Sequence, residues 1–211
     1  MTNFFRHLAT TGAFAMALQS LALAQPATGG AYTAPPVPAA IQAPEGNTLF
    51  LQAQVEGSQN YVCLPSASGF SWTFFSPQAT GFLDFKWIGG DIRKQIITHF
   101  LSSNPSENGT PRVTWQSSFD TSAVWGRSVG SSTDPNFVAE GAIPWLLLQA
   151  VGWRSGPAGG DILAHTTFVQ RLNTAGGVAP SAGCSQSDNV GATALVPYTA
   201  NYFFYKSSTK N

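Results

Sequence analysis

The feature that most constrains this chain is a pair of cysteines, Cys63 and Cys184, which are its only two cysteines. They lie 184 − 63 = 121 positions apart, and the second ends the stretch 167–184, TFVQRLNTAGGVAPSAGC, in which an expected strand leads into a glycine turn. Because there is no CxxC motif and no nearby histidine cluster, a structural disulfide is favoured over a metal pair or a redox site. Such a bond would tie the beginning of the domain to its end.

The N-terminal residues have the pattern of a targeting segment. Arg6 and His7 precede an uncharged run from Leu8 to Ala24, which ends in Ala-Leu-Ala. This pattern predicts a signal peptide over residues 1–24. The alternative is an N-terminal membrane anchor, but the run is shorter than the ~20 apolar residues that a span needs. We therefore expect a secreted or periplasmic protein, without a membrane span in the remaining chain.

Composition separates a leader from a single domain. Residues 25–46 are rich in Ala and Pro, and no charged side chain occurs between Gln25 and Pro44, which predicts a flexible leader. The remaining residues, 47–211, have a length that suits one domain. Charged residues make up 9% of the chain, against roughly 25% in an average globular protein, and no basic stripe is visible. Nucleic acid is therefore not an expected partner.

Runs of alternating apolar and polar residues fill the domain, and turn signals separate them. Thr48 to Glu56 alternates cleanly, and Gly57-Ser58 then suggests a turn. The segment 92–101 fits helical and strand spacing, and its β-branched residues favour a strand. The apolar run 143–151, IPWLLLQAV, predicts either a central strand or a short buried helix.

The pattern as a whole predicts an all-β protein. We expect a single antiparallel β-sandwich or barrel-like domain of roughly ten short strands, spaced about 8 to 12 residues apart and clamped by one disulfide. Within it, Gly176 and Gly177 are expected to form a tight turn that requires positive φ, as the surrounding Asn-x-x-Gly-Gly-x-x-Pro suggests.

Several separate motifs also occur together in a known family. They are Tyr61-Val62-Cys63, His99, Trp115, the turn Asp120-Thr121-Ser122, Ile143-Pro144-Trp145-Leu146-Leu147, QRLNTAGGVAP before Cys184, and VPYTANYFFY near the end. From about Asn47 to Lys206 the chain resembles the family catalogued as domain of unknown function 3455. In relatives a Gly-Pro-x-Trp commonly follows the histidine closely, whereas here the loop 104–111 intervenes and Thr110-Pro111 replaces Gly-Pro.

The resemblance implies export and a compact β domain, and it carries no established activity. Some relatives bear a malate dehydrogenase label. This chain has no GxGxxG after a strand and no alternating strand–helix pattern, so we expect no dinucleotide and no other cofactor.

Six residues are candidates for ligand contact. His99 and His165 are the only histidines left after cleavage, and His165 shares a strand face with Arg171 and Asn173 in a polar strip. A structural role for both histidines is the alternative, and two histidines without a close acidic pair do not predict a metal site. Aromatic faces stack on flat ligands, and the tryptophans expected to be exposed are those near the loop 104–111. The candidates are His99, Trp115, Trp125, His165, Arg171 and Asn173.

A catalytic alternative rests on residues 126–130, which match the GxSxG motif of serine hydrolases. That motif needs a strand, a sharp turn and a helix, but a polar loop follows Gly130. We therefore expect Ser128 to be a solvent-facing residue at the end of a strand and assign no catalytic residue. The favoured function is a non-catalytic β module that binds a small molecule, a carbohydrate or a surface component. The alternative is an extracellular hydrolase that uses Ser128 or a histidine-centred site.

Overall fold

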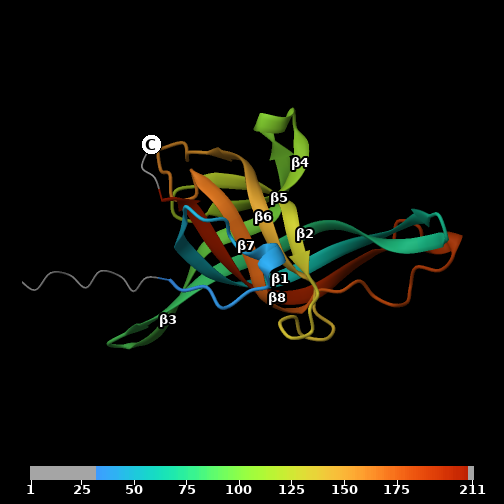
Figure 1. The fold of residues 1–211 in the computed structure, drawn as a ribbon. Helices are drawn as coiled ribbons and strands as arrows, with labels where there is room; N and C mark the ends of the chain where they lie inside the picture. Colours follow the sequence, from blue (N-terminus) through green and yellow to red (C-terminus); the bar gives the residue numbers. More distant parts are fainter. Residues whose placement is uncertain (1–31, 209–211) are drawn as a thin grey trace, which may run out of the picture. The chain divides into compact units, whose positions relative to one another are not determined.

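The computed structural model describes residues 32–208, which form an eight-stranded antiparallel barrel (Figure 1). Each strand pairs with its neighbour in sequence, and β1 pairs with β8 to close the barrel. The strands are β1 (Asn47–Ser66), β2 (Gly69–Trp87), β3 (Gly90–Asn104), β4 (Thr110–Ser117), β5 (Ala123–Ser132), β6 (Trp145–Arg154), β7 (Thr166–Gly176) and β8 (Thr193–Ser207). Three short 3-10 helices are η1 (Ala39–Ile41), η2 (Pro105–Glu107) and η3 (Ser187–Asn189).

The all-β prediction is confirmed, and the architecture is the barrel rather than the sandwich. The predicted signal peptide, residues 1–24, lies outside the described residues. No helix among residues 32–208 is long and apolar enough to cross a membrane.

The eight strands roughly match the ten expected, and the difference arises because one strand continues through a predicted turn. β1 passes Gly57, which pairs with Ala79 of β2 and Tyr198 of β8. A Cβ at this position would collide with the Gln78 carbonyl and with Ala79, so Gly57 permits a close approach of two strands instead of a reversal. Likewise, the alternating runs at 70–74 and 83–87 belong to one strand, β2.

The inner face of the barrel holds the larger core. Alternate residues of β8 contribute Tyr198, Ala200, Tyr202 and Phe204, as the alternation of the sequence predicted. These side chains pack with inward residues of the other strands, among them Trp115. The cluster also includes Ala53, Val55, Ala79, Ile96, Ile97, Val124, Ile143, Leu148, Leu163 and Val169.

A second core lies on the outer face of β6, β7 and β8. Its strand residues are those whose side chains point away from the barrel interior, namely Trp145, Leu147, Leu172, Phe203 and Tyr205. Ile41 and Val138 complete the cluster. Residues on both faces of β6 are therefore buried, which confirms that 143–151 contains a strand covered on both sides.

The N-terminal segment 32–46 covers this outer core and corrects the expectation of a flexible leader. Ile41 in η1 is 0% exposed, and its carbonyl accepts a hydrogen bond from Gln170 Nε2 at 2.7 Å. Ala34, Val37 and Ala43 pack against the same cluster. Burial of these few apolar residues on the barrel orders a segment whose composition alone predicts flexibility.

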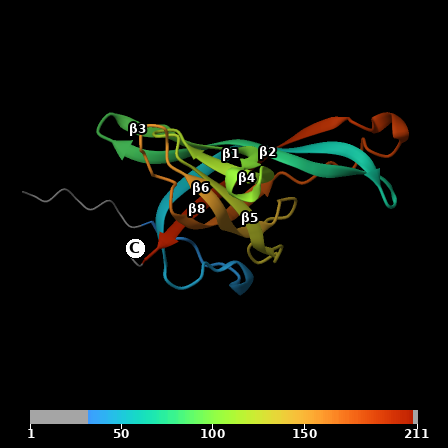
Figure 2. The ribbon, with the colours of Figure 1, turned by 90° about the horizontal axis from the view of Figure 1, so that it is seen from above.

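The β1–β2 hairpin extends beyond the barrel and forms an arm. The arm comprises residues 57–78, which precede the first β2–β3 pair at Ala79, together with residues 193–197 of β8, which pair with β1. Figures 1 and 2 both show the arm and the β2–β3 hairpin projecting on opposite sides of the barrel.

The predicted disulfide is confirmed and lies in the arm. Cys63 of β1 is bonded to Cys184 of the connection 177–192, with their Cα atoms 5.5 Å apart. Trp72 of β2 supports the same connection, because its Nε1 donates a hydrogen bond to the Ala182 carbonyl at 2.8 Å. The bond thus fixes the long β7–β8 connection against the arm.

We predict that the disulfide is a main source of stability for this arm. Thiol titration of the unfolded protein, prepared from an oxidising compartment, should detect no free cysteine. The double variant Cys63→Ala/Cys184→Ala should lower the free energy of unfolding in urea by about 4 kcal/mol, as the chain-entropy model gives for so long a loop. Two titratable thiols in the parent protein would contradict this prediction.

The turn at Gly176 and Gly177 has positive φ at both residues, 66° and 83°, as predicted. A Cβ at Gly177 would lie 2.9 Å from Tyr198 Cβ and 3.1 Å from Ile143 Cγ2. Gly141 is a matched position, because its φ is 71° and no atom lies within 4 Å of the added Cβ.

We therefore predict that Gly177→Val lowers the free energy of unfolding by about 3 kcal/mol, since backbone strain and steric overlap both contribute. Gly141→Val should lower it by about 1 kcal/mol through strain alone. Denaturant unfolding of both variants measures the difference, and equal losses would mean that packing at Gly177 does not matter.

Candidate functional site

The candidate site is a cavity of about 630 Å³ at the end of the barrel from which the arm projects. All eight strands and the connection 133–144 contribute to its lining. Its inner wall has buried side chains, including His99, Trp115 and Tyr202, and its edge has exposed ones, such as Phe74 and Arg127. The remaining lining residues are Gln59, Tyr61, Pro77, Leu101, Pro111, Arg112, Val113, Gly126, Ser128, Ile143, Pro144, Leu146, Leu148 and Arg171.

His99 and Trp115 form the inner wall as a cross-strand pair. They face each other in the β3–β4 register, and their rings stack with centroids 4.6 Å apart and an interplanar angle of 11°. The residues between them, including the loop 104–111, only lengthen the hairpin, which stays in register from His99–Trp115 to Asn104–Thr110. The long loop therefore leaves this pair intact.

Both ring nitrogens of His99 are engaged. Nδ1 lies 2.9 Å from the Thr114 carbonyl, which only accepts, so Nδ1 carries the proton. Nε2 then accepts a hydrogen bond from the Tyr202 hydroxyl at 3.2 Å. Burial lowers the pKa of His99 to about 3, although the bond to Thr114 opposes this shift, and the nearby charge of Arg171 lowers it further. His99 is therefore a neutral, structurally held imidazole.

Arg171 places a positive charge beside this wall. It pairs with Tyr202 in the β7–β8 register, and its guanidinium donates to the Pro144 carbonyl from Nη2 at 2.8 Å and from Nε at 3.3 Å. Within residues 32–208, no carboxylate forms an ion pair with it. Burial raises the pKa of Tyr202, and the positive charge of Arg171 partly offsets this rise.

The glycine turn after β7 positions this arginine. Thr174 Oγ1 donates to the Ile143 carbonyl at 2.6 Å, and the Ile143 amide donates to the Gly176 carbonyl at 3.0 Å. These bonds hold the 143–144 backbone, whose next carbonyl binds Arg171. Tyr61 closes the same region, because its hydroxyl donates to the Gly177 carbonyl at 2.6 Å.

Two hydrogen-bond donors on lining residues have no partner. Gln59 Nε2 and Trp115 Nε1 are both buried, and neither has an acceptor within hydrogen-bond geometry. The Tyr198 hydroxyl lies beside Gln59 and Tyr202 and lacks a well-formed hydrogen bond as well. Buried donors without acceptors are rare in folded proteins, and another one, Trp145 Nε1, lies in the outer core.

Three of the six candidate residues come together in the cavity, namely His99, Trp115 and Arg171. The expectation that Trp115 and Trp125 are exposed was wrong, because their exposed fractions are 0% and 4%. Trp125 lies outside the lining, and its Nε1 donates to Ser102 Oγ at 2.9 Å. Each tryptophan is covered within the sheet, although the loop next to it in sequence is exposed.

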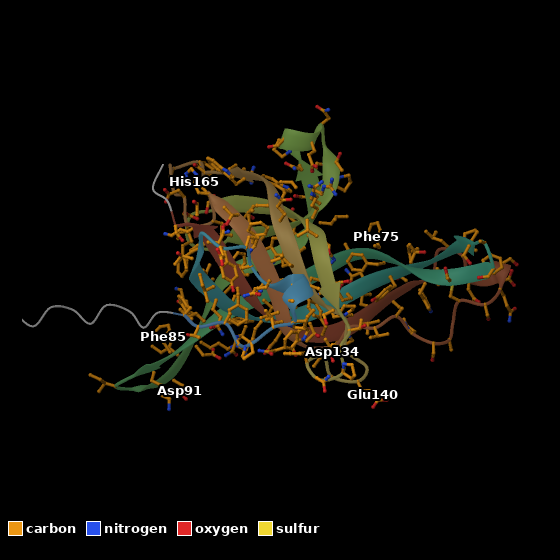
Figure 3. All side chains as sticks on the ribbon, viewed as in Figure 1. Phe75, Phe85, Asp91, Asp134, Glu140 and His165 are labelled. Atoms are coloured by element: carbon orange, nitrogen blue, oxygen red, sulfur yellow. A yellow bond between two sulfur atoms is a disulfide. The ribbon has the colours of Figure 1, made fainter. Side chains whose placement is uncertain are left out.

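His165 and Asn173 lie elsewhere, and the predicted polar strip does not form. Figure 3 shows His165 at the end of the barrel away from the arm that carries Phe75. His165 precedes β7, has a φ of 64°, and its ring lies 4.3 Å from that of Trp153. Asn173 is exposed with a φ of 51°, at an irregularity in the β7–β8 register. These two left-handed residues interrupt the strand alternation that the strip requires.

Ser128 is exposed, as expected, but it lies within β5 and not at its end, because the strand continues beyond Val129. Its hydroxyl donates to the Gly130 carbonyl at 3.4 Å, and the strand continues to Ser132. The GxSxG motif thus lies along a strand, without the sharp strand-to-helix turn that activates such a serine. Among residues 32–208, His, Cys, Asp and Glu do not gather in a group of three that could hold a metal ion.

Sequence reasoning missed several lining residues, chiefly Gln59, Tyr61, Arg112, Arg127 and Tyr202. Tyr202 belongs to the stretch VPYTANYFFY, and a tyrosine on the buried face of such a strand signals a hydroxyl that must find a partner. Arg127 lay within the GxSxG match. No signal in the sequence relates the two residues of β1 to this cavity.

We predict that burial of His99 makes the protein less stable as pH falls. The folded pKa is about 3, whereas an unfolded histidine titrates near 6.5. Between these values the unfolded chain binds more protons, so the free energy of unfolding falls by about 1.4 kcal/mol for each unit of decreasing pH.

Urea unfolding between about pH 4.5 and about pH 7 measures this slope. His99→Gln should reduce it by the amount stated, and His165→Gln, which changes an exposed histidine, should leave it unchanged. An equal slope in the parent and in His99→Gln would contradict the neutral, buried assignment.

Comparison with known proteins gives one match. The model of a family described as a protein of unknown function, DUF3455, matches residues 89–206, which are more than half of the chain. No curated protein and no solved structure matches the chain. The matched region contains His99, Trp115, Arg171 and Tyr202, and it begins after Gln59 and Tyr61. The chain belongs to the DUF3455 family of proteins of unknown function.

Proposed function

We propose that this protein is a non-catalytic binding module, secreted or periplasmic, which holds a small molecule in the cavity of its barrel. The observation that carries the proposal is the cavity itself, about 630 Å³ in volume. Ligand sites typically occupy about 300–1,000 Å³ and combine apolar walls with a few placed polar groups. An eight-stranded barrel is also wide enough to hold one small ligand.

The lining has this composition. Most of its side chains are apolar or aromatic, including Leu101, Val113, Leu146 and Leu148, and Arg171 is a polar group beside the buried wall. A site of this kind favours a ligand with an apolar body over a carbohydrate, whose many hydroxyls would lose hydrogen bonds against aliphatic walls.

The arrangement of the polar side chains supports binding over hydrolysis. A catalytic histidine needs a free nitrogen for proton transfer, but Thr114 and Tyr202 engage both nitrogens of His99. A catalytic serine needs a base within hydrogen-bond reach, whereas Ser128 donates to a backbone carbonyl. Placement in an oxidising compartment is supported by the Cys63–Cys184 bond, since such bonds are rare in the cytosol.

The test uses N-phenyl-1-naphthylamine, a neutral apolar dye that becomes fluorescent when it leaves water. We predict saturable binding of one dye per protein, accompanied by quenching of tryptophan fluorescence. Val113→Trp should weaken this binding at least tenfold, because the larger side chain fills part of the cavity. Val129→Trp is the matched control, since Val129 is exposed on β5 outside the lining, and it should bind as the parent does.

Circular dichroism of both variants checks that the barrel is folded. Absence of dye binding to the parent, or equal binding by the two tryptophan variants, would overturn the proposal.

A further inference from the structure

The charges around the cavity have one sign. Three arginines, Arg112, Arg127 and Arg171, are among its lining residues, and none of the lining residues is Asp or Glu. The whole chain has equal numbers of basic and acidic residues, ten of each, so this is a local concentration of positive charge. A cleft lined by charges of one sign attracts ligands of the opposite sign.

The three arginines differ in what neutralises them. Arg112 forms a two-point ion pair with Glu107, at 2.7 Å and 2.9 Å. Arg127 is exposed at the edge, where Nη2 donates to Gln149 Oε1 at 3.3 Å. Arg171 is half-buried and donates to the neutral Pro144 carbonyl, so that among residues 32–208 no carboxylate compensates its charge. A partly buried charge without a counter-ion is unfavourable, so this position suits an anionic group.

An unpaired donor on the cavity lining also favours an anionic ligand. Trp115 Nε1 is buried and has no acceptor among residues 32–208, and no lining residue offers an anionic acceptor. The site therefore has an excess of donors. Its natural complement is a group that only accepts hydrogen bonds and carries negative charge.

We propose that the ligand of this cavity is an organic carboxylate with an apolar body, whose carboxylate faces Arg171. The proposal rests on the binding function above and names the chemical class of the ligand. A carboxylate fits better than a phosphate monoester, because the inner wall has one uncompensated cation and a phosphate group brings nearly two negative charges. The apolar walls then cover the rest of the molecule.

The experiment compares decanoate with decanamide, which share a ten-carbon chain and differ in charge. Each is titrated against the parent protein loaded with N-phenyl-1-naphthylamine, and displacement of the dye gives its affinity. We expect decanoate to bind at least tenfold more tightly than decanamide at pH 7.5.

Variants identify the group responsible. Arg171→Gln should reduce decanoate affinity at least tenfold and change decanamide affinity less than threefold, while Arg171→Lys should retain part of the preference. Arg154→Gln is the control, because Arg154 is an exposed arginine at the end of β6 outside the lining, and this variant should keep the preference for decanoate. Dye binding and circular dichroism show that each variant is folded, and Arg171→Lys remains informative if Arg171→Gln does not fold.

The outcomes separate the two proposals. Dye binding with equal displacement by decanoate and decanamide overturns the carboxylate assignment and leaves the binding function standing. A preference for decanoate that persists undiminished in Arg171→Gln or, where that variant does not fold, in Arg171→Lys also overturns it, because the charge would then act from elsewhere. If the dye and both ligands fail to bind, the binding function itself is wrong.

Discussion

The pairing of β1 with β8 is the constraint on which the rest of the structure depends. It runs from Asn47–Ser207 to Val62–Thr193 and joins the first strand of the domain to the last. Closure removes the free edges that an open sheet would leave and creates an interior with one continuous face. Only in this closed form do residues from β1, β3, β7 and β8 reach one cavity.

The same pairing extends past the barrel into the arm, where the disulfide fixes the β7–β8 connection. The site and the arm therefore share one strand pair as their support.

Strand alternation lets the stretch after Thr167 serve both faces of the barrel. Gln170 points outward, where it binds the Ile41 carbonyl and accepts a hydrogen bond from the Tyr205 hydroxyl at 2.6 Å. Arg171, the next residue, contributes to the inner cavity. Since successive side chains of a strand point to opposite faces, adjacent residues can anchor the N-terminal segment and line the site. The glycine turn then follows, and its positive φ values allow the backbone to hold residues 143–144 and Tyr61. One short motif thus connects the outer core, the cavity and the arm.

The sequence was sufficient for the strands, the disulfide and the glycine turn, because each has a local signal. Period-two alternation at Thr48 to Glu56 predicted the first part of β1, and β-branched residues favoured a strand at 92–101. Continuous hydrophobicity at 143–151 predicted burial on both sides, while it left a short helix as the alternative. It was insufficient where a distant contact decides the outcome. Gly57 has the local signature of a turn, but the close approach of β2 makes it a strand residue. Residues 32–46 have the composition of a linker, yet Ile41 is covered against a surface formed by strands more than a hundred residues later.

For the site, His99, Trp115 and Arg171 were found as polar or aromatic residues on strands. Their convergence depends on closure and register, which no local pattern encodes.

His99 and Arg171 differ in whether the folded protein satisfies them, so one wall of the cavity combines a fixed side chain with an uncompensated charge. His99 is buried and has partners for both nitrogens, so the folded protein already satisfies it, and its ring fixes Trp115 by stacking. Arg171 is held in place by the Pro144 carbonyl, but a neutral carbonyl leaves its charge available. An apolar residue at this position would remove the unpaired charge from the barrel and fill the cavity, as stable cores do. Departures of this kind from the rules of stable packing occur mainly at functional sites, because the missing partner is supplied by the ligand. The rigid histidine therefore supports the wall, and under the proposed function the uncompensated arginine would select an anionic ligand.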